Sequence, residues 1–124
     1  MPITHGQVFV IPVADQDRAR DFSVDVLGFE LLQGVEMGPS MRWVQVAPPG
    51  SQTSITLANG FESMPPGSLR GTVLETDDLE GDLERFRAKG AVIASGIEEE
   101  FWGRFFWITD PDGNGVIIQS TTPR

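Results

Sequence analysis

The chain has 124 residues, of which 40% are hydrophobic and 22% charged, and its 18 acidic against 9 basic residues give a formal net charge of −9. These values are typical of one small globular domain, and the absence of cysteine excludes disulfide frameworks, thiolate metal sites and cysteine nucleophiles. The acidic balance argues against a nucleic-acid partner, and no apolar run predicts a membrane span or a signal peptide, so we expect a cytoplasmic protein without membrane association.

The first half of the chain predicts the element order strand, helix, strand, strand, strand. Residues 7–13 are rich in β-branched and aromatic side chains, which is typical of a strand. Asp15 is a good helix N-cap, and apolar residues recur at steps of three and four through 16–26, before Gly28, so a helix is predicted there. Three short strands are predicted after the helix: 29–33, 42–47 and 54–57.

The second half of the chain repeats this order. A shift of 63 positions superposes four pairs of identical residues: Asp15 and Asp78, Pro48 and Pro111, Gly50 and Gly113, Ile55 and Ile118. The predicted helix of this half is 79–88. Its predicted strands are 72–76, 92–94, 104–109 and 116–120. The repeat indicates that the chain is built from two copies of one module.

Two irregular stretches separate these elements. Residues 59–69 contain Asn-Gly and Pro-Pro-Gly and predict a linker, whereas 95–103, with three successive glutamates, predicts a surface loop or lid. We therefore expect a single domain over residues 1–124, with a first module at about 5–58, the linker at about 59–69 and a second module at about 70–122.

Three segments carry a family resemblance: 11–15 (IPVAD), 27–29 (LGF) and 110–114 (DPDGN). Their combination resembles the vicinal oxygen chelate superfamily, which includes glyoxalase I, extradiol dioxygenases and the bleomycin resistance proteins. The resemblance implies an α+β fold of two βαβββ modules, in which curved mixed sheets enclose a concave cavity. It also implies that two copies of the chain form a homodimer.

Metal enzymes of this superfamily usually carry four ligands, a His or Gln in the first strand of each module and a Glu in the last. Counted onto this chain, the four positions are Val8, Ser54, Gly71 and Ile117. Divalent ions need carboxylate, imidazole or comparable donors, so we expect no metal and no cofactor.

A shifted register is the alternative for a metal site. It would bring His5, Gln7 and Gln119 into the cavity. Strand side chains alternate with period two, so His5 and Val8 face opposite sides if the strand extends that far. A solvated His5 near the chain terminus is therefore the simpler interpretation.

Alternation also divides the strands into two faces. The predicted helix-covered core is Phe9, Ile11, Val13, Ile55, Leu57, Leu74, Val116 and Ile118. The opposite face mixes small, apolar and polar residues, which is typical of a small-molecule pocket. The ligand-binding residues predicted on it are Val8, Val10, Thr56, Val73, Glu75, Ile117 and Gln119. Glu75 faces either a wet cavity or a cation, unless it lies exposed at an edge.

Trp102 is added to this predicted site because a tryptophan in a loop over a cavity can stack on a planar ligand or hold a cation. Trp43 and Trp107 lie in predicted strands whose orientation is open, so they pack in a core or dimer interface or form a pocket wall. The 110–114 segment has the residues that a tight turn requires and lacks the spacing of a calcium loop.

These observations predict a metal-free binding protein of the glyoxalase/bleomycin resistance type that sequesters an aromatic or cationic small molecule. The alternative is a metal-dependent lyase or dioxygenase of the same superfamily, or a metal-independent catalyst with Glu75 as general base. Whether the protein is an enzyme stays open, and no catalytic residue is assigned. A structural or regulatory dimer without a ligand is the third hypothesis.

Overall fold

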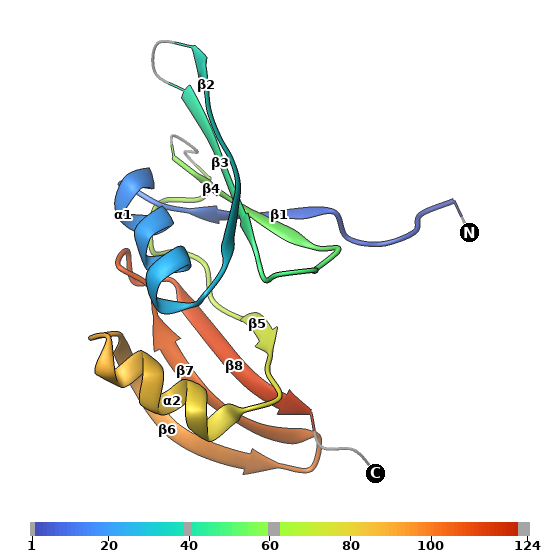
Figure 1. The fold of residues 1–124 in the computed structure, drawn as a ribbon, viewed down its shortest axis with the longest axis vertical. Helices are drawn as coiled ribbons and strands as arrows, with labels where there is room; N and C mark the ends of the chain where they lie inside the picture. The colour runs from blue at the N-terminus through green and yellow to red at the C-terminus, as the bar shows by residue number, and fades with distance from the viewer. Residues whose placement is uncertain (1, 39–40, 60–62, 122–124) are drawn as a thin grey trace.

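The computed structural model describes residues 2–38, 41–59 and 63–121, and it contains two four-stranded sheets, one from each half of the chain (Figure 1). The first sheet has the order β1-β4-β3-β2. Its strands are β1 (Val8–Pro12), β2 (Glu30–Gly38), β3 (Met41–Ala47) and β4 (Ser54–Ala58). The second sheet has the order β5-β8-β7-β6. Its strands are β5 (Thr72–Glu75), β6 (Val92–Glu100), β7 (Gly103–Thr109) and β8 (Gly115–Thr121).

Both sheets are mixed, because the first strand of each half pairs parallel with the last and the remaining neighbours pair antiparallel. This arrangement confirms the predicted α+β fold of two βαβββ modules. The curved sheets stay open and do not close into a barrel (Figure 1). Neither helix among the described residues has the length and apolar composition needed to cross a bilayer.

Each module has one helix, and both helices begin at the predicted cap. Asp15 caps α1 (Gln16–Asp21) by accepting a hydrogen bond from the Arg18 backbone N–H. Asp78 caps α2 (Leu79–Ala88) in the same way through the Gly81 N–H. The first helix continues as a π-helical turn, η1 (Phe22–Val26), before Gly28 turns the chain with φ of 78°.

Each helix covers one face of its sheet and closes a hydrophobic core. The first core contains Ile11, Val13, Ala19, Phe29, Val44, Val46, Ile55 and Leu57. The second contains Leu79, Phe86, Phe106, Ile108, Val116 and Ile118. Leu27 and Leu74 pack against both cores, so the two modules share apolar contacts.

The predicted core is correct with one exception. Seven of its eight residues belong to the two cores or pack against them, whereas the Phe9 side chain is 60% exposed. Phe9 lies on β1, which is the edge strand of the first sheet. Parity along the strand placed it on the core face, where it is opposite the buried Ile55, but at the edge of the sheet its side chain stays largely uncovered.

The turn at 110–114 joins the modules, and the structure shows why its residues are needed. The Asn114 side chain is fully buried, and its Nδ2 donates to the Pro12 carbonyl in the first module (2.9 Å) and to Asp110 Oδ2 (2.8 Å). Its Oδ1 accepts the Leu69 N–H (3.1 Å). The Asp112 carboxylate accepts the Ala14 N–H from the first module (3.0 Å). The turn is therefore a structural clasp, as its sequence indicated.

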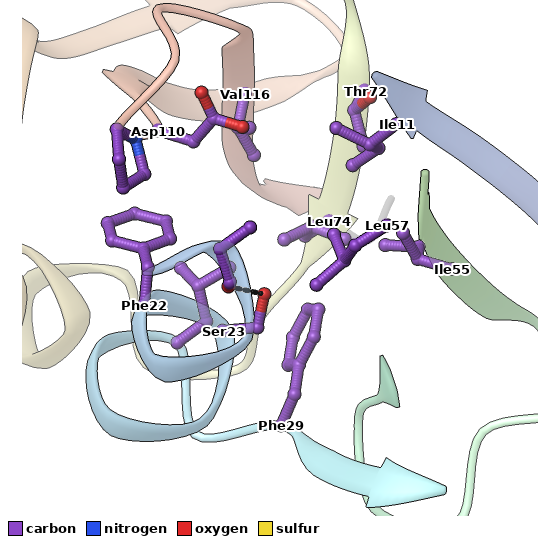
Figure 2. Close-up of a pocket in the computed structure, with 13 residues that line it drawn as sticks. Ile11, Phe22, Ser23, Phe29, Ile55, Leu57, Thr72, Leu74, Asp110 and Val116 are labelled. Atoms are coloured by element: carbon purple, nitrogen blue, oxygen red, sulfur yellow. Dashed lines mark hydrogen bonds between the residues drawn. The ribbon is translucent and has the colours of Figure 1, made fainter. Parts of the chain in front are cut away.

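A small void lies beside this clasp, between the modules. Figure 2 shows Phe22 and Phe29 directed from the first module toward Leu74 and Asp110 of the second, with Ser23 hydrogen-bonded back to a helix carbonyl. The void measures about 20 Å³, which is room for about one water molecule. It is a small gap in the packing between the two modules, and it is too small for an organic ligand.

The prediction of a surface loop or lid at 95–103 is wrong. Strand β6 runs to Glu100 and pairs with β7 up to its last residue, where Glu100 is opposite Gly103. Two register shifts, between Ile93 and Ser95 and between Ser95 and Glu98, interrupt the side-chain alternation that would otherwise have identified a strand.

Candidate functional site

Each sheet packs one face against its helix, and we call the opposite face its open face. Side chains that lie directly opposite one another in paired strands share a face. Val10 of β1 is opposite Thr56 of β4, and Thr56 is opposite Gln45 of β3. The open face of the first sheet therefore includes Val8, Val10, Trp43, Gln45, Ser54 and Thr56.

The open face of the second sheet follows from the same rule. Trp107 of β7 is opposite Ile117 of β8, and Ile117 is opposite Val73 of β5. This face includes Val73, Glu75, Phe105, Trp107, Ile117 and Gln119. As far as the structure describes the two cores, they include no side chain from either open face. The tryptophans on these faces are therefore not explained by core packing.

An aromatic row follows β7 on the second open face. The Trp102 ring, which is 45% exposed in the turn between β6 and β7, stacks on Phe105 with a centroid distance of 6.3 Å and an interplanar angle of 8°. Trp107 continues the row and lies over Gly115, where a Cβ added to the glycine would come within 3.1 Å of the indole ring. The row presents ring faces of the kind that stack on planar compounds.

A chain of polar groups lies on the first open face. The Trp43 indole N–H donates to Gln45 Oε1 (2.8 Å), and Gln45 Nε2 donates to the Ser54 hydroxyl (2.7 Å). The hydroxyl donates in turn to the Gln7 carbonyl (3.2 Å). Ser54 is 5% exposed, so the chain leads from the partly exposed indole to the floor of the sheet. The two open faces thus differ in chemistry, one being polar and the other aromatic.

Acidic residues accompany the aromatic row. Glu98 on β6 is opposite Phe105, and Glu75 on β5 is opposite Gln119. The Glu75 carboxylate accepts the Thr121 N–H (3.0 Å) and the Thr121 hydroxyl (2.7 Å), so it holds the end of β8 against β5. With the net charge of −9, these carboxylates favour a neutral or cationic compound over an anion at this face.

The four positions expected to hold a metal in this fold carry unsuitable donors. Val8 and Ile117 offer hydrocarbon, and Gly71 offers no side chain. The Ser54 hydroxyl is already engaged with Gln45 and Gln7. Across the described part of the chain, no group of three or more His, Cys, Asp or Glu side chains could hold a metal ion. These residues do not fit a divalent ion.

The alternative site at a shifted register is not assembled either. His5 lies exposed in the extended segment before β1, where its Nδ1 is 3.0 Å from the Thr4 hydroxyl. Gln119 lies on β8, in the second sheet. His5 and Gln7 thus precede the first strand of the first sheet, whereas Gln119 is part of the second sheet.

Seven of the eight predicted ligand-binding residues lie on the two open faces, and Trp102 lies beside them in the turn that precedes β7. Thr56 is 2% exposed and donates to the Val44 carbonyl, so it forms part of the floor. The open faces also carry Gln45 and Phe105, which the sequence analysis does not assign to the site, and Trp43 and Trp107, whose orientation it leaves open. Parity along β3 and β7 cannot place these residues until the pairing with β4 and β8 is known.

Two grooves flank β5 where the modules meet. One has a volume of about 510 Å³ and runs from Pro48 and Pro49 of the β3–β4 turn to Glu75 and α2. The other, of about 410 Å³, lies between the open edges of β1 and β5 and is lined by Phe9, Val10 and Val73 among others. The second groove therefore reaches both open faces.

Residues 6–118 match the model of the family described as Glyoxalase/Bleomycin resistance protein/Dioxygenase superfamily. TnmS3, an antibiotic binding protein from Streptomyces sp. CB03234, is 43% identical with a TM-score of 0.92, over 98% of this chain and 99% of that one. A glyoxalase/bleomycin resistance protein from the same organism is 42% identical with a TM-score of 0.84, over 94% and 100% of the two chains. A superfamily member from Sphaerobacter thermophilus DSM 20745 is 32% identical with a TM-score of 0.87, over 97% and 99%.

Proposed function

Because the chain belongs to the glyoxalase/bleomycin resistance protein/dioxygenase superfamily, we propose that it binds a small aromatic or cationic compound on its open faces without a metal ion. The observation that carries the proposal is the aromatic row of Trp102, Phe105 and Trp107, which neither described core includes. The 43% identity to a protein described as antibiotic binding supports the same class of function.

The physical basis of binding is stacking combined with charge. A planar ring system laid on the aromatic row covers the exposed part of Trp102 and the partly exposed rings of Phe105 and Trp107. A positive substituent on that ring system gains attraction from Glu98, which lies opposite Phe105, and from the π faces themselves. The donors at the four metal positions give no such support to a metal-dependent lyase or dioxygenase.

A homodimer is part of this proposal. β1 and β5 are edge strands, and the apolar side chains Phe9 and Val73 on them are 60% and 50% exposed. Exposed apolar strand edges favour association, so we propose that a second copy covers the groove between β1 and β5 and brings further open-face residues to the ligand. Light scattering is expected to give twice the chain mass of 13.6 kDa. The Phe9→Asp variant is expected to shift the mass toward the monomer, and a monomeric wild-type protein would contradict the dimer.

The test of ligand binding is calorimetric titration with planar aromatic cations such as proflavine. Replacing Trp102 by alanine is expected to weaken binding about fivefold or more, because a stacked aromatic pair contributes about 1 kcal/mol. Val24→Ala is the control, since Val24 lies exposed on η1, on the helix side of the molecule. Absence of heat with every compound, or equal affinities of the wild type and the Trp102 variant, would contradict the proposal.

A further inference from the structure

The hydrogen-bond chain on the first open face has a fixed direction. An indole N–H can only donate, so Gln45 must turn its carbonyl oxygen toward Trp43. Its amide nitrogen then faces Ser54 and donates to the hydroxyl. The hydroxyl, having accepted that bond, keeps its own hydrogen for the Gln7 carbonyl. Trp43 therefore determines which end of the Gln45 amide faces which neighbour.

This direction leaves Gln45 with a donor to spare. A glutamine amide carries two N–H groups, and Ser54 takes one of them. Among the described residues, nothing accepts the second N–H. Gln45 is partly buried on the open face, so water satisfies this N–H only while the face is uncovered. A ligand that covers the face removes the water and must supply an acceptor, or else the N–H is left unpaired.

We propose that Gln45 determines ligand specificity by selecting planar compounds that carry a hydrogen-bond acceptor, such as a ring carbonyl, over compounds of the same outline without one. This inference rests on the proposed binding function, in which a second copy brings the first open face to the ligand on the aromatic row, and it adds the class of ligand that the site takes. Trp43 is the positioning residue, since its N–H holds the amide in the selective orientation. A site whose buried donor is left unpaired discriminates more strongly than one that merely loses an apolar contact.

The test compares two soluble probes, a fluorenone and a fluorene that carry the same tertiary-amine side chain and differ only in the ring carbonyl. The wild-type protein is expected to bind the fluorenone about tenfold or more tightly, the ratio that one unpaired buried N–H produces. In Gln45→Leu the ratio is expected to fall to about one, while fluorene affinity is retained because stacking is unchanged. Gln52→Leu is the matched control, since it removes the same side chain from an exposed turn.

Two further variants keep the test decisive if leucine disturbs the sheet. Gln45→Glu keeps the shape of the side chain but removes its N–H groups, so the preference for fluorenone is expected to disappear or reverse. Trp43→Phe keeps a ring and frees the amide to rotate, so the preference is expected to shrink while circular dichroism stays unchanged.

The outcomes separate this inference from the proposed function. If the wild type binds both probes equally, or if the ratio survives in both Gln45 variants, the specificity role of Gln45 is wrong and ligand binding stands. If neither probe binds the wild type, the proposed binding function is contradicted, and the inference falls with it.

Discussion

Asn114 joins the two modules through one fully buried amide. Its Nδ2 reaches the Pro12 carbonyl across the module boundary, and its Oδ1 accepts the Leu69 N–H from the segment before β5. Alanine at this position would remove the partner of both backbone groups at a position that is fully buried. Each unpaired buried group costs about 1–3 kcal/mol, so Asn114 contributes more to the free energy of unfolding than the size of its side chain indicates.

We expect Asn114→Ala to lower the free energy of unfolding by about 3 kcal/mol because it orphans these two groups. Urea denaturation followed by circular dichroism measures the change. Asn59→Ala is the control, since Asn59 is exposed at the end of β4 and its loss should cost less than about 0.5 kcal/mol. Equal costs for the two variants would mean that Asn114 does not hold the modules together.

Asp110, in the same turn as Asn114, is a partly buried titratable group. Burial raises the pKa of its carboxyl group above the usual value, and this effect outweighs the hydrogen bonds that it accepts from Asn114 and from the Asp112 N–H. A group whose folded-state pKa is raised stabilises the fold below its unfolded-state pKa and loses that contribution as the pH rises through the folded-state pKa.

The Asp110→Asn variant removes this titration. We therefore expect the unfolding free energy of the wild type minus that of the variant to be larger near about pH 3 than near about pH 7. Arg42 and Arg104 lower the pKa values of Asp17 and Glu80, whose contributions are lost as the pH falls. Both pairs are present in the two proteins and cancel in the difference. If this difference grew with rising pH, the pKa of Asp110 would not be raised in the folded state.

At the scale of elements, β6 is the informative case. Three glutamates in succession on exposed chain are typical of a solvated loop, and the register shifts in this strand hide its period-two pattern. Pairing with β7 nevertheless continues through Glu98, Glu99 and Glu100. The backbone bonds to β7 are what hold the segment, since its side chains are mostly exposed.

Proteolysis after glutamate distinguishes a strand from a lid. We expect the native protein to be cleaved within 98–100 at least about tenfold more slowly than the urea-unfolded protein, because a protease needs an extended chain released from its neighbour. Mass spectrometry of the fragments over time measures the rate. Immediate nicking of the native protein at these glutamates would indicate a mobile lid.

At the scale of the molecule, the modules are coupled through shared apolar side chains. Leu74 on β5 and Leu27 after η1 pack against both cores, and Phe22 and Val26 of the first module pack against the core of the second. Phe22 and Val26 are the first and last residues of the π-helical turn η1. We therefore expect the two modules to unfold as one cooperative unit.

Leu74→Ala tests this coupling. It is expected to cost about 2–3 kcal/mol and to shift the unfolding of both modules together, because one side chain supports both cores. Proteins that keep only Trp43 or only Trp107 report on each module separately by fluorescence. Val92→Ala, at a position that is 62% exposed, is the control. Two separate transitions would contradict the coupling.

Local features of the fold could be read from the amino-acid sequence because they depend on near neighbours. Asp15 and Asp78 cap the helices through residues three positions away, and the predicted bounds of α2 agree with the structure. The candidate site was predictable only along strands whose parity could be counted from a known position. That condition held for β1, β4, β5 and β8, and it failed for β3 and β7.

The sequence by itself determined which residues alternate, where the helices begin and that two modules of one plan follow each other. Only the tertiary structure decided that Gln45 lies beside Ser54, that Trp107 lies opposite Ile117, and that Phe9 is left uncovered. The reason is physical: alternation and capping are set within a few bonds along the chain. Strand register and burial depend instead on which distant segment pairs with the strand and how far a helix reaches over it.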